Sequence, residues 1–360
     1  MQIVRASYYS QNMAFQTPLP STQTGIIQHE GGVLQITHGL PIPELGPHQM
    51  LVKTAAVALN PCDFKMPLRF PTPGLWDGCD FSGTVVALGS EAAAQGRFRV
   101  GDRAFGAVQG SNMSDPTSGA YCEYIRTEPE FAFHIPKEMD LINAPSLSGT
   151  GIATLGVALF WSLQLPGTLL TPASKAEDVL IYGGSTTIGL LAIQMVKLDL
   201  VTSYGADLVF DYNSPTCAED IRAATKNTLR YVLDPFAEAK TLRMCYAAIG
   251  RTGGRYCALE QYQESLCSRK TVKHELVMGG AISGRGVELP DPYGIPPRPE
   301  IGVWARSWYI EIQELIENGQ LKPCPIQTLP GRFDGILEGL DMLRNGKVSG
   351  KKLVVPMVTN

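Results

Sequence analysis

The sequence predicts a two-domain α/β protein, with a β-rich first domain and a second domain in which strands and helices alternate. Its 360 residues exceed what one ordinary hydrophobic core holds, so two cores are expected. Residues 31–126 contain short apolar or alternating runs separated by Gly, Pro and Asp, which is typical of strands and turns. From residue 178 onward, a strand, a glycine turn and a helix open an alternating α/β half.

Composition places the chain among ordinary globular proteins. Hydrophobic residues make up 44% and charged residues 18% of the sequence, which excludes collagen-like and disordered classes. The net charge of -4 argues against a nucleic-acid binder, because such a protein needs a basic face to neutralise phosphates. We find no apolar run close to the roughly 20 residues of a membrane helix, so no membrane partner is expected. Eight cysteines without a C-x-x-C pair indicate a reducing compartment, and we expect a cytoplasmic protein.

The first domain is predicted to be a compact β-barrel-like module. Its expected strands lie at residues 33–39, 50–60, 78–89, 99–107 and 120–126. A Gly/Ala/Leu-rich helical stretch at 149–163 and a polar linker follow, which places a domain boundary near residue 165. We therefore expect an N-terminal tail at 1–22 and a first domain at 23–165.

The second domain is predicted at 166–305, with a C-terminal segment at 306–360 that returns to the first domain. Apolar runs of strand type and amphipathic runs of helix type alternate along it. The expected strands are 178–184, 208–212, 229–234, 254–259 and 352–357. The expected helices are 190–198, 217–226, 240–249, 310–319 and 335–346.

The turn from Gly183 to Gly189 is the segment of this half with the clearest chemical implication. A helix N-terminus offers free N–H groups to a diphosphate, and glycine lets the backbone approach closely. The turn reads GGSTTIG rather than a full G-x-G-x-x-G, so an ordinary strand-to-helix turn is the alternative interpretation. Its position at the start of the α/β half favours dinucleotide binding.

Motifs in order along nearly the whole chain, from about residue 22 to 355, resemble the medium-chain dehydrogenase/reductase superfamily. They are AVALNPCDFKM, GCDFSGTVVALGS, FRVGDRAFG, GAYCEYI, IYGGSTTIGLLAIQM, YGADLVFDY and NGKVSGKKLVV. KNTLRYVLD and YAAIGRTGGRYCAL are most similar to the trans-acting enoyl reductases that serve fungal polyketide synthases. The resemblance implies a GroES-like β-barrel catalytic domain and a Rossmann dinucleotide-binding domain.

The resemblance also implies that this chain works without zinc. Zinc enzymes of the superfamily have a cysteine where this chain has Asn60, and a His-Glu pair where it has Cys79 and Asp80. A zinc site needs about three well-placed protein ligands, and this set falls short. No metal is therefore expected, and Cys79 is interpreted as a small buried apolar residue.

By the same resemblance, the chain is expected to be an NADPH-dependent enoyl reductase that reduces an α,β-double bond of a carrier-bound polyketide thioester. Hydride addition to the β-carbon builds negative charge on the thioester oxygen until the α-carbon is protonated. Lys65 and Thr154 are the expected catalytic residues. The alternatives are a solvated surface lysine and a threonine that caps the helix it opens.

The resemblance further assigns the residues that line the two ligands. Those expected around the cofactor are Cys62, Asp63, Phe64, Lys65, Ser185, Thr186, Thr187, Ile188, Tyr212, Leu259, Glu260, Leu353 and Val354. Those expected around the acyl chain are Leu155, Gly156, Val157, Ala158, Leu159, Phe160, Trp161, Ser162, Ala281, Ile282, Ser283, Gly284 and Arg285.

One part of the superfamily pattern is missing from this chain. Relatives have about a dozen further residues where this sequence passes directly from Leu198 to Asp199, including the second strand of the Rossmann sheet and the loop that receives the 2′-phosphate of the cofactor. Deletion of a central strand leaves backbone donors and acceptors unpaired on its neighbours. We therefore expect a shortened sheet, and both stability and NADPH preference are open at this point.

Two other functions are compatible with the sequence. A quinone or enone reductase would act on free small molecules, and a cofactor-deficient chain would persist only as a non-enzymatic partner of the synthase. The expected macromolecular partner is an acidic carrier domain of a polyketide synthase, with Arg69, Arg285 and Arg298 as possible contacts. A monomer is expected, as in the trans-acting reductases.

Overall fold

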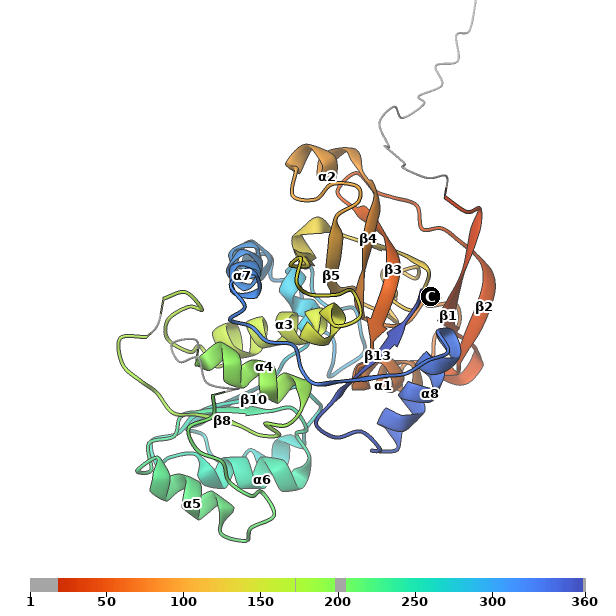
Figure 1. Ribbon diagram of the computed structural model, residues 1–360. Helices are drawn as coiled ribbons and strands as arrows, with labels where there is room; N and C mark the ends of the chain where they lie inside the picture. The colour runs from red at the N-terminus through yellow and green to blue at the C-terminus, as the bar shows by residue number, and fades with distance from the viewer. Residues whose placement is uncertain (1–18, 172, 198–204, 359–360) are drawn as a thin grey trace, which may run out of the picture.

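The computed structural model describes residues 19–171, 173–197 and 205–358 of the chain. Within them, two sheets lie in two halves of the molecule, joined by a central group of helices (Figure 1). The first sheet and a hairpin form the half that contains the N-terminal strands. The second sheet carries the alternating α/β elements.

The first sheet has seven strands in the order β12-β13-β3-β4-β5-β7, and β6 also pairs with β3. These strands are β3 (Met50–Ala58), β4 (Asp80–Leu88), β5 (Arg103–Ala107), β6 (Tyr124–Thr127), β7 (Ala132–His134), β12 (Ile326–Thr328) and β13 (Lys352–Pro356). The predicted β-rich first domain is confirmed. Across the described residues, the strand pairing follows an open path, and a closed barrel is not formed.

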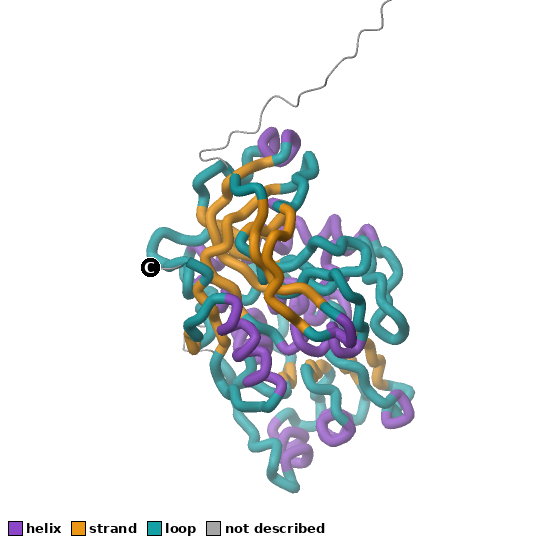
Figure 2. Tube along the Cα trace, turned by 90° about the vertical axis from the view of Figure 1, so that its right-hand side faces the viewer, coloured by secondary structure: helices purple, strands orange, loops and turns teal. Residues whose placement is uncertain are grey.

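A hairpin covers one side of this sheet. It consists of β1 (Thr22–Gln28) and β2 (Leu34–Pro41), with the short η1 (Glu30–Gly32) at its turn. Single bridges join Gly25 to Cys122 and Ile27 to Trp76. Burial of Ile26, Trp76 and Tyr121 in the same apolar cluster holds the hairpin in place. Figure 2 shows these strands gathered in one half of the molecule.

Helix α1 (Pro61–Arg69) begins directly after the central strand β3. Asn60 and Asp63 form a capping box, in which the Asn60 N–H donates to Asp63 Oδ2 at 2.8 Å. Pro61 occupies the first helical position, where its missing N–H costs no hydrogen bond. This start fixes where the side chains of Lys65 and Arg69 emerge, one turn apart on α1.

The centre of the molecule is a continuous helical run. It comprises η3 (Ala144–Leu147), α3 (Gly149–Leu155) and the π-helical η4 (Gly156–Ser162). The 19 residues from 144 to 162 are long and apolar enough to cross a membrane, which corrects the expectation that no run reaches that length. Of the tested window, 83% is buried inside the protein, so this run packs as a core helix.

The second sheet has four parallel strands in the order β11-β10-β9-β8. They are β8 (Val179–Ile181), β9 (Tyr231–Asp234), β10 (Gly254–Ala258) and β11 (Val272–Leu276). Alternate side chains along these strands point to opposite faces of the sheet and pack in two different apolar clusters. Val232 and Tyr256 belong to one cluster, whereas Leu233 and Cys257 belong to the other. A parallel sheet covered on both faces is the architecture expected of a dinucleotide-binding domain.

Helices cover the two faces of this sheet (Figure 1). Helices α5 (Cys217–Ala224) and α6 (Ala239–Ala248) lie on one side, and α4 (Thr187–Val196) lies on the other, toward α3. The remaining short elements are α2 (Ser90–Gln95), η2 (Pro129–Phe131), η5 (Glu264–Leu266) and η6 (Gly279–Ser283).

The prediction of a strand at residues 208–212 is wrong. This segment is irregular, and Leu208, Val209 and Tyr212 are exposed, with Val209 87% exposed. Among the described residues, β8 therefore pairs with β9 alone, and its side chains are half-buried. The junction between Leu198 and Asp199 lies outside the described residues.

The C-terminal segment returns to the first sheet. Helix α7 (Pro299–Glu317) begins eleven residues before the predicted start because Pro299 opens it and Ile301, Ala305 and Trp308 extend its buried face. Helix α8 (Phe333–Arg344) then packs on the first sheet, and β13 pairs with β3.

Candidate active site

The glycine turn and Glu260 lie at the same edge of the second sheet. The turn follows β8, and Glu260 follows β10 by two residues. Because the strands are parallel, their carboxyl ends meet along one edge, which is where α/β sheets bind ligands. Helix α1 of the first domain reaches this edge through Lys65, whose Nζ lies 2.9 Å from Glu260 Oε2.

Glu260 is the hydrogen-bonding centre of this contact. Arg69 Nη1 lies 3.0 Å from Glu260 Oε1, the backbone N–H of Gln261 donates to the same oxygen at 2.9 Å, and the Tyr293 hydroxyl also donates to it. Burial alone would raise the pKa of Glu260, but the hydrogen bonds from Tyr293, Gln261 and Lys65, with the charge of Lys65, lower it to about 2. Glu260 is therefore an anion at neutral pH.

The turn after β8 begins α4 with a defined cap. Thr186 Oγ1 accepts a hydrogen bond from the Gly189 N–H at 3.0 Å and donates to the Gly183 carbonyl at 2.8 Å. Gly183 has a φ of 69°, which glycine adopts without strain. A Cβ at Gly189 would lie 2.3 Å from the Gly183 oxygen, so the turn needs glycine there. The first N–H groups of α4, from Thr187 and Ile188, lack intrahelical acceptors, as at any helix start.

Three aromatic residues surround this turn. Tyr182 contacts Tyr212 and Phe236, with ring centroids 5.6 and 5.7 Å apart. Phe236 is held by the turn after β9, where Asp234 Oδ1 accepts the Phe236 N–H at 3.0 Å. The structure thus places Tyr212 against Tyr182, the residue that precedes the turn, and adds Tyr182 and Phe236 to the residues there. Sequence reasoning missed these two because no motif marks them.

Thr154 does not cap a helix. It lies near the end of α3, whose N-cap is Ser148, and its hydroxyl donates to the Thr150 carbonyl at 2.8 Å. A Cβ at Gly279 would lie 2.5 Å from Thr154 Oγ1, so η6 passes directly over this hydroxyl. The alternative interpretation, in which Thr154 caps the helix, is therefore wrong. The lone pairs of the Thr154 hydroxyl can accept a further hydrogen bond.

A buried ammonium contacts Asn60 and Asp80, two of the residues compared above with those of the superfamily zinc enzymes. Lys352 Nζ donates to Asp80 Oδ2 at 3.1 Å and also to Asn60 Oδ1. Asn60 Nδ2 and Ser148 Oγ donate to the same Asp80 oxygen at 3.0 and 2.8 Å. Asn60 and Asp80 are therefore both engaged by a protein cation. Sequence reasoning did not identify Lys352.

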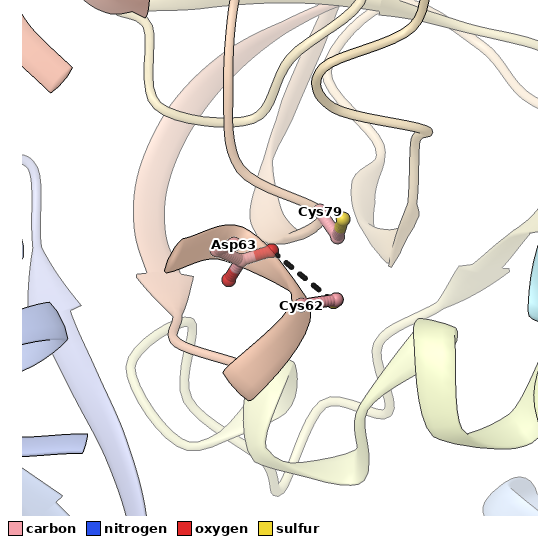
Figure 3. A group of neighbouring side chains, drawn as sticks. All are labelled: Cys62, Asp63 and Cys79. Carbon is pink, nitrogen blue, oxygen red and sulfur yellow. Dashed lines mark hydrogen bonds between the residues drawn. The ribbon is translucent and has the colours of Figure 1, made fainter. Parts of the chain in front are cut away.

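Cys62, Asp63 and Cys79 form a neighbouring cluster, with one ligand-type atom from each within 4.8 Å of the others (Figure 3). Both Asp63 oxygens are used: Oδ1 accepts from the Cys62 thiol, and Oδ2 accepts from the Tyr121 hydroxyl at 2.5 Å. A hydrogen bond with Cys79 lowers the pKa of Cys62, but burial and Asp63 outweigh it, and the pKa is raised. A hydrogen bond with Cys62 and burial raise the pKa of Cys79 well above its usual value. To bind a metal ion, Asp63 would have to give up its hydrogen bond from the Tyr121 hydroxyl or from the Cys62 thiol.

The two segments predicted to line an acyl pocket are brought together. Residues 155–162 continue α3, and η6 packs against α3 and α7. Most of these side chains are buried, whereas Phe160 and Trp161 are partly exposed beside Trp304 of α7. Ser162 also lines a hollow with Arg255 and Lys273 on the side of β10 and β11. Phe160, Trp161 and Trp304 thus form a partly exposed aromatic cluster, whereas the hollow beside Ser162 is lined mainly by polar and charged side chains.

Three residues predicted around the cofactor are engaged in other packing. Leu353 and Val354 are buried in the first sheet, and the Leu353 carbonyl accepts the Leu59 N–H at 3.0 Å. Leu259 is half-buried, and its N–H donates to the Asp234 carbonyl at 3.2 Å. Only Leu259 of these lies at the carboxyl edge of the second sheet.

The arginines expected to meet an acidic carrier already have acidic neighbours. Arg69 pairs with Glu260, and Arg298 Nε lies 3.0 Å from Glu300. Arg285 Nη2 lies 2.5 Å from Glu128, whose hydrogen bond raises the pKa of that guanidinium. Their positive charges are neutralised locally, so they do not by themselves form a basic docking patch.

Comparison with known proteins decides the family. Residues 46–137 match the alcohol dehydrogenase GroES-like domain. The chain is 51% identical to trans-enoyl reductase ffsC of Aspergillus flavipes over 357 residues, an alignment that covers 95% of this chain and 97% of the relative. The chain belongs to the family of fungal trans-enoyl reductases. It is also 52% identical to enoyl reductase cheB of Chaetomium globosum over 358 residues, covering 94% of this chain and 95% of that protein.

The family confirms the predicted class of enzyme. This trans-enoyl reductase family member is an oxidoreductase of the medium-chain dehydrogenase/reductase superfamily, with the two-domain α/β fold expected from its sequence. A solved structure of the mycobacterial protein Rv1454c, complexed with NADPH, has the same fold, with a TM-score of 0.68 and 18% identity over 93% of this chain and 100% of that chain.

Proposed function

We propose that this protein is an NADPH-dependent reductase that acts in trans on the α,β-double bond of a polyketide intermediate, carried as a thioester on a synthase carrier domain. The observation that carries the proposal is the Lys65–Glu260 contact, which brings a cationic side chain of the first domain to the ligand-binding edge of the second sheet. The relatives named trans-enoyl reductases support the reaction class.

The residues present fit a dinucleotide. Gly183 and Gly189 leave the turn without side chains where a Cβ would collide with Phe236 or with the turn itself. The N–H groups of Thr187 and Ile188 at the start of α4 would face a diphosphate, and the helix dipole favours an anion there. Tyr212, half exposed beside Tyr182, would pack against the adenosine end.

Lys65 and Thr154 would carry the chemistry that the protein supplies. When bound, NADPH provides the hydride that adds to the β-carbon of the enoyl thioester. The Lys65 ammonium would stabilise the negative charge that develops on the thioester oxygen and donate a proton toward the α-carbon. Thr154 Oγ1, which already donates to Thr150, would accept a hydrogen bond from the carboxamide of the nicotinamide.

The cellular setting follows from the same proposal. All eight cysteines are free thiols, which agrees with a reducing compartment, and we propose a cytoplasmic location beside the synthase. A monomer that docks transiently on the carrier domain is the state proposed for turnover. The synthase is then the partner, and the acyl chain on its carrier is the substrate.

Two measurements on the purified protein test the proposal. The first is a fluorescence titration with NADPH, which reports cofactor binding despite the shortened sheet. The second is NADPH oxidation with an α,β-unsaturated pantetheine thioester, compared with a free enone of similar reactivity. We expect saturable NADPH binding and turnover of the thioester above that of the enone, unaffected by a metal chelator.

Each outcome has a defined meaning. Intact NADPH binding with no turnover of a saturating enoyl thioester would overturn the proposed activity. Faster turnover of free enones would instead identify a quinone or enone reductase. A flat titration that is rescued by inserting the missing strand after Leu198 would identify a cofactor-deficient partner of the synthase.

A further inference from the structure

A loop from Arg285 to Arg298 links η6 to α7 and contacts the first domain. Hydrogen bonds hold this loop in place at several points along its length. The Ser114 hydroxyl donates to Glu288 at 2.8 Å, and a short antiparallel bridge joins Val287 to Ile295. The Tyr293 hydroxyl donates to Glu260, as described above. The loop therefore contacts the first domain and the carboxyl edge of the second sheet together.

Tyr293 is buried within this loop, with 3% of its surface exposed. Its ring packs edge-on against Phe70, with centroids 5.8 Å apart, and the guanidinium of Arg69 lies 4.7 Å from the ring centroid. Both partners belong to the end of α1, whose preceding turn carries Lys65. Tyr293 thus contacts α1 through its ring and Glu260 through its hydroxyl.

The two oxygens of Glu260 accept hydrogen bonds from different donors. Oε2 accepts from Lys65, while Oε1 accepts from Tyr293, Arg69 and the Gln261 N–H. The bonds to Oε1 fix the rotation of the carboxylate, and this in turn fixes where Oε2 holds the Lys65 ammonium. Lys65 is 39% exposed on its side chain, so packing alone does not restrain it.

We propose that Tyr293 is a positioning residue of the reduction, acting through Glu260 to hold the Lys65 ammonium in place. This inference rests on the proposed function, because it gives Lys65 a role in turnover. The same loop begins at Arg285, the last residue of the segment expected to line the acyl chain. A substrate that shifts this loop would therefore alter kcat through Lys65 rather than only KM.

A double-mutant cycle tests the inference. Tyr293→Phe is expected to lower kcat about tenfold with little change in the KM for NADPH, since it removes one hydrogen bond and keeps the ring. In a Lys65→Met background, the same substitution should have no further effect on kcat. Tyr262→Phe is the matched control, because its hydroxyl also bonds a side chain, His274, but lies away from Lys65. A full effect of Tyr293→Phe in the Lys65→Met background would overturn the inference.

A second measurement does not depend on activity. The rate at which an amine-reactive reagent labels Lys65 in the cofactor-free protein can be followed by peptide mass spectrometry. We expect Tyr293→Phe to raise this rate severalfold and Tyr262→Phe to leave it unchanged. Unchanged labelling in Tyr293→Phe would contradict the positioning role even if the protein proved inactive on enoyl thioesters. Raised labelling in an inactive protein would instead support the positioning of Lys65 by Tyr293 and overturn only the proposed reaction.

Discussion

Lys352 and Asp80, 272 residues apart in the chain, form an ion pair at 3.1 Å in the centre of the first domain. Their side chains are 3% and 0% exposed. The pair joins the last strand, β13, to the central strand β4, and Asp80 Oδ1 also accepts the Thr150 N–H at the start of α3 at 2.8 Å. The C-terminal segment is thereby tied to the helix that carries Thr154.

Removal of one member of this pair should be costly. Lys352→Met is expected to lower the free energy of unfolding by about 3–5 kcal/mol, because it leaves Asp80 charged and buried without a cation. Urea denaturation measures this difference. The exposed neighbour Lys351 provides the control, since Lys351→Met should change stability by less than about 0.5 kcal/mol. Equal effects of the two substitutions would show that the ion pair is not needed for stability.

The depressed pKa of Glu260 predicts a pH dependence of stability. The pKa falls from an ordinary 4.5 in the unfolded chain to about 2 in the folded protein, so the stabilisation is complete above about pH 4.5 and is lost as pH falls toward 2. Glu260→Gln should therefore be less stable than the wild type by about 1–2 kcal/mol at pH 7, and the difference should shrink below pH 4.5. Urea unfolding at several pH values tests this. A difference that stays constant down to the acid limit would contradict the assignment.

Alanine substitutions at two positions of the glycine turn are expected to weaken NADPH binding to different extents. Gly189→Ala would place a Cβ 2.3 Å from the Gly183 oxygen and should weaken NADPH binding by about tenfold or more. Gly184→Ala meets only the tip of Ile193 at 3.3 Å, so it is the matched control in the same turn. Fluorescence titration of both variants with NADPH measures the two affinities. If both bind NADPH as the wild type does, this turn does not hold the diphosphate.

The hydroxyl of Thr154 is expected to matter for turnover rather than for folding. Thr154→Val keeps the shape of the side chain and should lower kcat about tenfold, whereas Thr154→Ser should retain most activity. Thr225→Val is the structural control, because the Thr225 hydroxyl makes the same bond to a carbonyl four residues earlier, at 2.8 Å, on α5. Steady-state kinetics and thermal unfolding separate the two effects. Comparable losses of activity in Thr154→Val and Thr225→Val would rule out a local role.

Local patterns predicted most of the elements. The alternating runs predicted β2 to β6, whereas β1, β7 and β12 were not predicted. The run from residue 178 predicted β8, the turn and α4 in the right order. The strand expected at 208–212 failed because a β-prone sequence forms a strand only when a neighbour accepts its backbone hydrogen bonds. In the described residues, β8 has β9 as its sole neighbour.

The sequence by itself determined the family, the two-domain order and the glycine turn, since these depend on residues close together in the chain. Only the tertiary structure decided the partners of Lys65, Asp80 and Thr154. Glu260 is 195 residues from Lys65, and Lys352 is 272 residues from Asp80. No local spacing encodes such contacts, because they arise only where α1 meets the end of β10, and where β13 meets β4, after the chain has packed.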